Sequence, residues 1–138
     1  MRFLQEIAYK KDATSQQMLD LYLPDTNNFP TFVHFHGGGL ESGDKKGMHS
    51  TGEYLAAHGI AFVTANYRLY PDAVYPEFIR DAAAAVARTK KHIAEYGGND
   101  RIYVGGNSAG AYLSMMLCFD SRWLTNRRRI KRKNPHIQ

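Results

Sequence analysis

Short apolar runs that alternate with helix-like segments constrain the fold of this chain more than any other feature. The strand-like runs, rich in β-branched and aromatic residues, are Thr31–Phe35, Ile60–Ala65 and Ile102–Val104. Segments with apolar residues at three- and four-residue intervals cover about 48–58, 77–96 and 109–119. Strands that alternate with helices pack as a parallel sheet with helices on both faces. The sequence therefore predicts an α/β fold.

The N-terminal part has a different pattern. Apolar and polar residues alternate over Met18–Leu23 before the turn at Pro24-Asp25, which is typical of a half-buried strand. A weaker strand-like segment, from about Phe3 to Tyr9, precedes it. We expect these two segments to form an antiparallel hairpin. The predicted sheet is thus mostly parallel, with an antiparallel hairpin at its N-terminus.

Length and composition favour one domain. The chain has 138 residues, of which 43% are hydrophobic and 22% charged, enough for one core. Cys118 is its single cysteine, which excludes an internal disulfide and makes a reduced, cytoplasmic setting the default expectation. No segment approaches the ~18 apolar residues of a membrane span. We expect no membrane partner.

The positive charge is concentrated at the C-terminus. After Asp120 come seven basic residues and no acidic one, more than the net charge of +5: Arg122, Arg127, Arg128, Arg129, Lys131, Arg132 and Lys133. We expect residues 1–120 to form the domain and 121–138 a disordered basic tail. Such a tail is either inert, as after a frameshift or truncation, or an arm for nucleic acid or a membrane surface. We favour the first reading, with no nucleic-acid partner, because nothing else resembles a nucleic-acid-binding module.

The sequence Gly106-Asn107-Ser108-Ala109-Gly110 lies between a predicted strand and a predicted helix. A serine on such a tight turn is held in a strained conformation with its hydroxyl above the sheet, and glycines two residues away allow strand and helix to approach closely. The helix start also places positive dipole density where a negative oxygen would develop. A glycine-rich turn that merely contains a serine is the alternative, which the flanking elements disfavour.

A second motif, His36-Gly37-Gly38-Gly39, follows the strand-like run that ends at Phe35. Consecutive glycines let backbone N–H groups turn toward a developing oxyanion. Glycine-rich loops also bind phosphate, but a phosphate loop would open a helix and carry a nearby Lys-Ser/Thr. Here the acidic residues Glu41 and Asp44 follow. We therefore interpret the motif as an oxyanion loop.

Residues 17–120 resemble the N-terminal part of the α/β-hydrolase superfamily, within it the carboxylesterases related to hormone-sensitive lipase and the bacterial acetyl and feruloyl esterases. Four features carry the resemblance in the family's order: HGGG at 36–39 with its continuation at 41–45, Asn66–Pro71, Tyr75-Pro76 before a helix with Asp81, and GNSAG at 106–110. The resemblance implies an α/β-hydrolase fold that stops after the helix behind the serine.

The resemblance also implies roles for individual residues. Ser108 is the expected nucleophile, and the N–H groups of Gly38, Gly39 and Ala109 form the expected oxyanion hole. His36 is expected to orient the glycine loop. The other expected supporting residues are Gly37, Gly106, Asn107, Gly110 and Asp81. Asn107 stands where Asp is more usual in the hormone-sensitive lipase group. This difference leaves the subfamily and the substrate less defined than the mechanism. No metal or organic cofactor is implied.

The acid and base of a catalytic triad are not evident. In this superfamily they follow the serine along the chain, but only Asp120 and His136 do so here, one beside the serine's helix and one in the basic tail. We expect structural or exposed roles for the upstream histidines, which are His34, His49, His58 and His92.

Two hypotheses follow. The first is a carboxylic-ester hydrolase that acts on small short-acyl or acetyl esters through an acyl-serine, with its acid and base missing from this chain. The alternative is a non-catalytic homologue or gene fragment that needs a partner. In either case the sheet would end at Ile102–Val104, and we expect self-association through this exposed, apolar edge.

Overall fold

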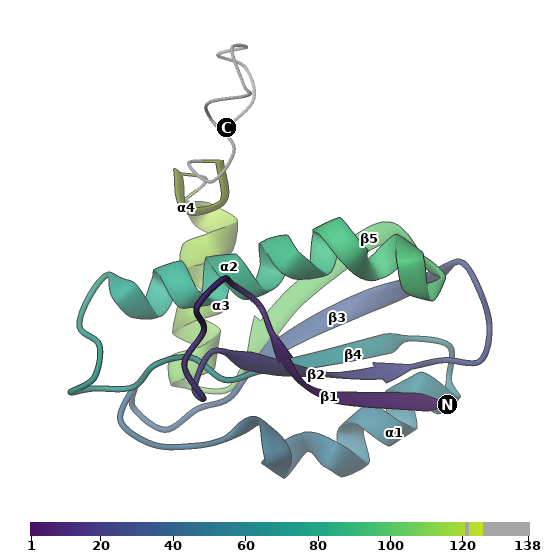
Figure 1. The fold of residues 1–138 in the computed structure, drawn as a ribbon, viewed down its shortest axis with the longest axis horizontal. Coiled ribbons are helices and arrows are strands. Elements are labelled where there is room, and N and C mark those ends of the chain that lie inside the picture. Colours follow the sequence, from purple (N-terminus) through teal and green to yellow (C-terminus); the bar gives the residue numbers. More distant parts are fainter. Residues whose placement is uncertain (121, 126–138) are drawn as a thin grey trace.

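A five-stranded mixed sheet in the order β1-β2-β4-β3-β5 forms the centre of the computed structural model, which describes residues 1–120 and 122–125 (Figure 1). The strands are β1 (Arg2–Ala8), β2 (Met18–Leu23), β3 (Phe29–Phe35), β4 (Ala61–Ala65) and β5 (Gly98–Gly106). The helices are η1 (Lys45–Met48), α1 (His49–Ala57), α2 (Glu77–His92), η2 (Ile93–Tyr96), α3 (Ala109–Phe119) and α4 (Arg122–Thr125). The predicted α/β architecture with an antiparallel hairpin at its N-terminus is confirmed.

The predicted N-terminal hairpin, β1 and β2, lies at one edge of the sheet. β1 pairs with β2 and β2 with β4, both antiparallel, whereas β3 pairs in parallel with β4 and β5. Val33 of β3 lies between Val63 of β4 and Val104 of β5. Because β3 and β5 run in parallel, Phe35 and Gly106 lie side by side at their C-terminal ends. The segments that follow these two residues therefore begin next to each other.

Two element boundaries differ most from the sequence prediction. The predicted helix over 77–96 is α-helical only to His92 and continues as the 3₁₀ turn η2, which is followed by its capping residue Gly97 with φ of 103°. The predicted strand Ile102–Val104 is the middle of the longer β5. Its polar first residues lack apolar alternation, and they join the sheet through pairing of Gly98 with Phe29.

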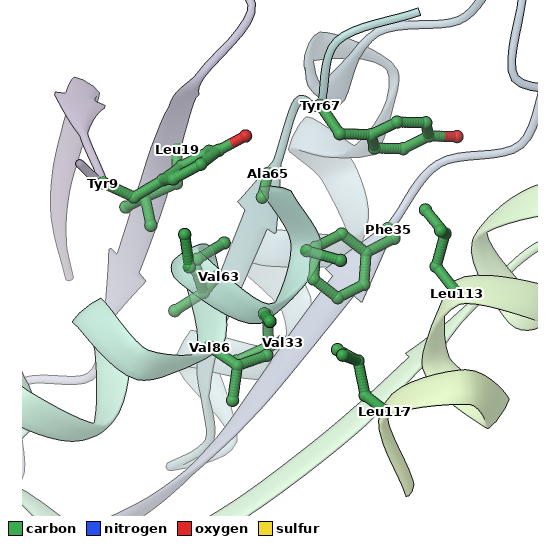
Figure 2. Close-up of a cluster of buried hydrophobic side chains, with 14 of the residues drawn as sticks. Tyr9, Leu19, Val33, Phe35, Val63, Ala65, Tyr67, Val86, Leu113 and Leu117 are labelled. Carbon is green, nitrogen blue, oxygen red and sulfur yellow. The ribbon is translucent and has the colours of Figure 1, made fainter. Parts of the chain in front are cut away.

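Helices cover both faces of the sheet, and the larger core lies under α2 and α3. Figure 2 shows Val86 of α2 and Leu113 and Leu117 of α3 directed toward Val33 and Phe35 of β3, and all five are buried. A smaller cluster on the opposite face joins α1 to β2 and β4 through Tyr22, Ala56 and Phe62.

The structure also bears on the C-terminal segment and the sheet edge. Trp123 and Leu124 of α4, which belong to the segment predicted to be a disordered tail, pack against the core. The remainder of that prediction, residues 121 and 126–138, lies outside the described residues. Within the described chain β5 is an edge strand, as expected. Self-association through it stays a prediction. None of the helices described is long and apolar enough to cross a membrane.

Candidate active site

Ser108 lies at the turn between β5 and α3, as the sequence predicts. Its φ is 50° and its ψ is −111°, and it is exposed. A positive φ is unfavourable for a residue with a side chain and persists only where the surrounding structure enforces it. The chain thus holds the Ser108 hydroxyl on a strained turn at the start of a helix.

The two motif glycines explain how this turn fits against the sheet. A Cβ atom added to Gly110 would overlap the carbonyl oxygen of Phe35 and lie 2.6 Å from its carbonyl carbon. A Cβ on Gly106 would meet the same oxygen and lie 2.6 Å from the carbonyl carbon of Gly110. Only residues without a side chain allow β5 and α3 to close on the end of β3 here, which confirms the expected close approach.

The glycine loop after β3 reaches the same turn. A Cβ on Gly37 would lie 3.4 Å from the Ser108 Cβ and 2.9 Å from the Asn107 carbonyl oxygen. Gly38 and Gly39 follow with φ of 129° and 65°, and a Cβ on Gly39 would meet nothing within 4 Å. The loop therefore borders Ser108 through Gly37, while the oxyanion role of Gly38, Gly39 and Ala109 stays a prediction.

Hydrogen bonds within the loop fix its shape. The Gly38 carbonyl oxygen accepts from the backbone N–H groups of Glu41 at 3.1 Å and Ser42 at 3.0 Å. It also accepts from the Ser42 hydroxyl at 3.1 Å. A Cβ on Gly43 would overlap the Gly37 carbonyl oxygen and the His36 ring, so this glycine permits the loop to fold back on its own start.

His36 is buried at the start of the loop. Its Nδ1 donates to the Gly37 carbonyl oxygen at 2.7 Å, and its ring stacks on Tyr67 with centroids 4.5 Å apart. The Tyr67 hydroxyl in turn donates to the His36 carbonyl oxygen at 2.7 Å. Burial lowers the pKa of His36, and its Nε2 has no hydrogen-bond partner among the described residues. These contacts hold the loop in place and favour a neutral ring.

His34 contacts the turn in a way that sequence reasoning missed. Its Nε2 lies 2.8 Å from the side-chain oxygen of Asn107, the residue before Ser108. Because that oxygen only accepts, Nε2 carries the proton. The parallel register places His34 opposite Gly105, two residues before Asn107. His34 therefore holds the turn from the neighbouring strand, consistent with the structural role expected for it.

The other histidines of the described residues lie elsewhere. His49 Nδ1 is 2.9 Å from the Tyr22 hydroxyl, His58 bonds the Tyr54 carbonyl at 2.8 Å, and His92 pairs with Glu95. Within residues 1–120 and 122–125 no hydrogen bond joins a histidine to Ser108. His136 lies outside the described residues, and Asp120 pairs with Arg122 at 2.9 Å.

Asp81 is a buried junction between three segments. Its carboxylate accepts from the Arg68 backbone N–H at 2.9 Å, from two guanidinium nitrogens of Arg68 at 2.9 and 3.0 Å, and from the Gln17 side chain at 2.9 Å. It thus ties α2 to the segment that carries Tyr67, which stacks on His36. Sequence analysis singled out Asp81 and the segment that contains Arg68, but it did not pair Asp81 with Arg68 or with Gln17.

Lys45 is a second junction, and sequence analysis gave it no role. Its side chain is buried and pairs with Glu6 and, at 3.1 Å, with the buried carboxylate of Asp20. Burial by itself lowers the pKa of Lys45, but hydrogen bonds to Glu6 and Asp20 outweigh it and raise the pKa. Its backbone N–H donates to the Asn66 side chain at 2.8 Å. The end of the glycine loop is therefore fixed to β1 and β2.

The part of the chain that the structure describes contains no group of three or more His, Cys, Asp or Glu residues that could hold a metal ion.

Comparisons with known proteins place these features in a family. Residues 19–135 match the family model described as BD-FAE. The chain is 36% identical over 99 residues to the probable isoprenylcysteine alpha-carbonyl methylesterase ICMEL1 of Arabidopsis thaliana, covering 70% of this chain and 21% of that protein. It is 39% identical over 93 residues to the probable carboxylic ester hydrolase LipM of Mycobacterium tuberculosis, covering 66% and 22%.

Solved structures agree with the sequence matches. Esterase B of Lactobacillus rhamnosis superposes with a TM-score of 0.75 at 31% identity, over 81% of this chain and 37% of that one. Est2 of Thermogutta terrifontis superposes with a TM-score of 0.72 at 29% identity, over 79% and 41%. The chain thus spans less than half the length of these relatives. It belongs to the BD-FAE family, among the esterases of α/β-hydrolase fold.

Proposed function

We propose that the chain supplies the nucleophile and the oxyanion-binding part of a serine carboxylic-ester hydrolase. The observation that carries the proposal is the backbone of Ser108, an exposed serine held at φ of 50° between β5 and α3. Ester hydrolases among the relatives support the reaction type. Est2 is described with propionate and with butyrate bound, which supports short acyl groups for this chain.

The proposed reaction begins with attack of the Ser108 Oγ on the ester carbonyl carbon. The carbonyl oxygen becomes an oxyanion, to which the N–H groups of Gly38, Gly39 and Ala109 would donate. The N–H of Ala109 belongs to the first turn of α3, where the helix dipole favours negative charge. The alcohol then leaves with a proton, and water releases the acid from the acyl-serine.

Proton transfer is the step that the described residues do not serve. The Ser108 proton has to pass to a base and from it to the leaving alcohol, because an unassisted hydroxyl is a weak nucleophile. His34 and His36 lie beside the turn, but neither ring is hydrogen-bonded to Ser108 among the described residues. The ring nitrogens left to accept a proton, Nδ1 of His34 and Nε2 of His36, are both buried. We therefore propose that the base comes from outside residues 1–120 and 122–125.

An added base tests this proposal. Incubation with p-nitrophenyl acetate should acetylate Ser108, and imidazole in the buffer should accelerate this, with the adduct located by peptide mass spectrometry. The Ser108→Ala variant should lose the adduct. Ser50→Ala, which removes another exposed serine, on α1, should retain it. Acetylation that is unchanged in Ser108→Ala would contradict the proposal.

A non-catalytic homologue is the second candidate. His34 is hydrogen-bonded to Asn107 and His36 to Gly37, so neither of these neighbouring histidines is bonded to Ser108. This favours the second candidate, because the described residues keep the turn but do not bond a base to the serine. If Ser108 is not acetylated even at high imidazole concentration, while circular dichroism shows a folded chain, this candidate is preferred.

A further inference from the structure

A cavity lined by basic side chains lies between α2 and the connection from β1 to β2 (Figure 1). Its volume is about 440 Å³, within the ~300–1,000 Å³ of small-molecule sites. Lys10 and Lys11 line it from the connection, and Arg88 and Lys91 line it from α2. Among the described residues, no Asp or Glu lines this basic cavity.

We propose that the basic cavity binds the phosphate groups of a small molecule that carries two or more negative charges. The proposal does not depend on the proposed ester hydrolysis. It is also independent of any element that pairs with β5, because β1 lies at the opposite edge of the sheet. None of the lining residues belongs to β5, α3 or α4.

Helical spacing explains the wall that α2 contributes. Ala84, Ala87, Arg88 and Lys91 are separated by three, four and seven residues from the first of them, so they share one face of the helix. The two alanines have short side chains and leave room beside the helix. The two cations lie along the same face, next to this room.

Contacts at both ends of the connection fix it against the rest of the molecule. Tyr9, directly before the two lysines, is buried, and its hydroxyl donates to the Asn66 carbonyl oxygen at 2.9 Å. At the other end the Gln17 side chain donates to Asp81 of α2 at 2.9 Å. A connection held in this way loses less conformational freedom when a ligand binds, which favours affinity.

The four cations have no acidic partner in the part of the chain that the structure describes, where none of them takes part in an ion pair. Arg88 is nevertheless half-buried. It lies three residues from Lys91, and like charges at this spacing destabilise a helix. His92, which also lines the cavity, pairs with Glu95 at 2.7 Å. An anion in the cavity would offset the repulsion among the four cations.

The types of the basic residues indicate the ligand. Arginine binds phosphate through two parallel hydrogen bonds, and lysine binds it as a point charge. Four cations around one cavity attract a diphosphate more strongly than a single carboxylate, because Coulomb attraction grows with the charge of the ligand. A bilayer surface is flat and would contact the rim of the cavity without filling it. These features favour a small phosphorylated molecule.

Isothermal titration calorimetry with sodium diphosphate tests the proposal. The ionic strength is kept constant with sodium chloride, because salt screens exposed charges. We expect saturable binding of one diphosphate per chain, and at least tenfold weaker binding of acetate. Arg88→Gln and Lys91→Gln should each raise the dissociation constant about tenfold, since each removes a charged hydrogen-bond donor.

α2 itself provides matched controls. Arg80→Gln and Lys90→Gln remove the same kinds of charge from exposed positions of this helix that do not line the cavity. Both should leave the dissociation constant unchanged, and circular dichroism shows whether each variant is folded. An equal loss of affinity in the control variants would mean that diphosphate responds only to net charge, which would overturn the proposal.

Lysine acetylation of the unaltered chain locates the site without any substitution. Diphosphate should protect Lys10, Lys11 and Lys91 from an acetylating reagent and leave Lys46 and Lys90, two exposed lysines outside the cavity, as reactive as before. Peptide mass spectrometry measures the difference.

Three further results would overturn the proposal. One is heat that does not saturate or that chloride reproduces at equal ionic strength, and another is equal protection of all five lysines. The third is a chain that sediments with vesicles of phosphatidylcholine and phosphatidic acid but does not bind diphosphate, which would indicate a membrane surface instead.

Discussion

At the scale of single residues, His36 connects protonation to the shape of the glycine loop. Its Nδ1 proton is bound to the Gly37 carbonyl oxygen, so an added proton would go to Nε2. That atom is buried, and no described residue forms a hydrogen bond with it. Protonation would thus place a charge and an unpaired donor in the core, and both are unfavourable. This explains why burial lowers the pKa of His36.

The lowered pKa predicts that the folded state loses stability in mild acid. Below the ordinary histidine pKa of 6.5 the unfolded chain binds a proton that the folded chain does not. The free energy of unfolding therefore decreases as the pH is lowered. The loss should continue down to the lower native pKa and then level off. Urea denaturation at several pH values below 7.5 measures this slope.

His36→Phe is the control for that measurement. Phenylalanine keeps a ring on Tyr67 but cannot be protonated, so the variant should have a shallower dependence of its urea midpoint on pH. An identical pH dependence in both proteins would mean that other groups cause the loss of stability.

A second prediction at this scale concerns Gly110. Gly110→Ala forces a methyl group against the carbonyl of Phe35, so α3 or the end of β3 has to move. We expect the free energy of unfolding to decrease by about 1–3 kcal/mol, as it does when a core is overpacked. Gly47→Ala is the matched control, because a Cβ there meets nothing within 4 Å. Urea denaturation followed by circular dichroism compares the two variants, and equal midpoints would contradict the assigned contact.

At the scale of elements, Lys45 connects the glycine loop to β1 and β2. Replacing it with methionine would leave the carboxylate of Asp20 buried without its cation. Breaking a buried pair in this way costs about 3–5 kcal/mol. Lys46→Met, at the neighbouring exposed position, should cost little, and Lys45→Met combined with Asp20→Leu should recover part of the loss.

The pH dependence of this pair has the opposite sign to that of His36. Because the folded pKa of Lys45 is raised, its stabilisation is fully present below the ordinary value of 10.5 and declines only as pH rises through the folded pKa. Urea midpoints at neutral pH therefore measure the complete effect. A Lys45→Met variant as stable as Lys46→Met would contradict the assignment.

Elements with a clear periodicity were predictable from the sequence. The buried face of α2, with Phe78, Ala82 and Val86, follows the helical spacing, and β4 follows its apolar run. The first half of β5 was not predictable, because Asn99 and Asp100 are polar and lie where the register between β5 and β3 is irregular. Local patterns do not report such pairing.

The same limit applies to the candidate site. The glycines of both motifs and the positive φ of Ser108 follow from local sequence. The contacts of Asp81 with Gln17 and of Lys45 with Asp20 join residues far apart in the chain, and they depend on the position of β2 in the sheet. Only the folded chain brings these partners together.

At the scale of the whole molecule, the parallel pairing of β3 with β5 brings the glycine loop to Ser108, yet the described fold gives the serine no base. We therefore predict that the 138-residue chain hydrolyses p-nitrophenyl acetate barely faster than its Ser108→Ala variant. In a serine hydrolase, loss of the catalytic histidine lowers kcat on the order of 10⁶-fold, because the triad acts as a unit. Steady-state release of p-nitrophenol, without imidazole, measures the difference. Robust turnover that requires Ser108 would show that the chain contains a functional base, and His34→Gln and His36→Gln variants would then test the two histidines nearest the turn.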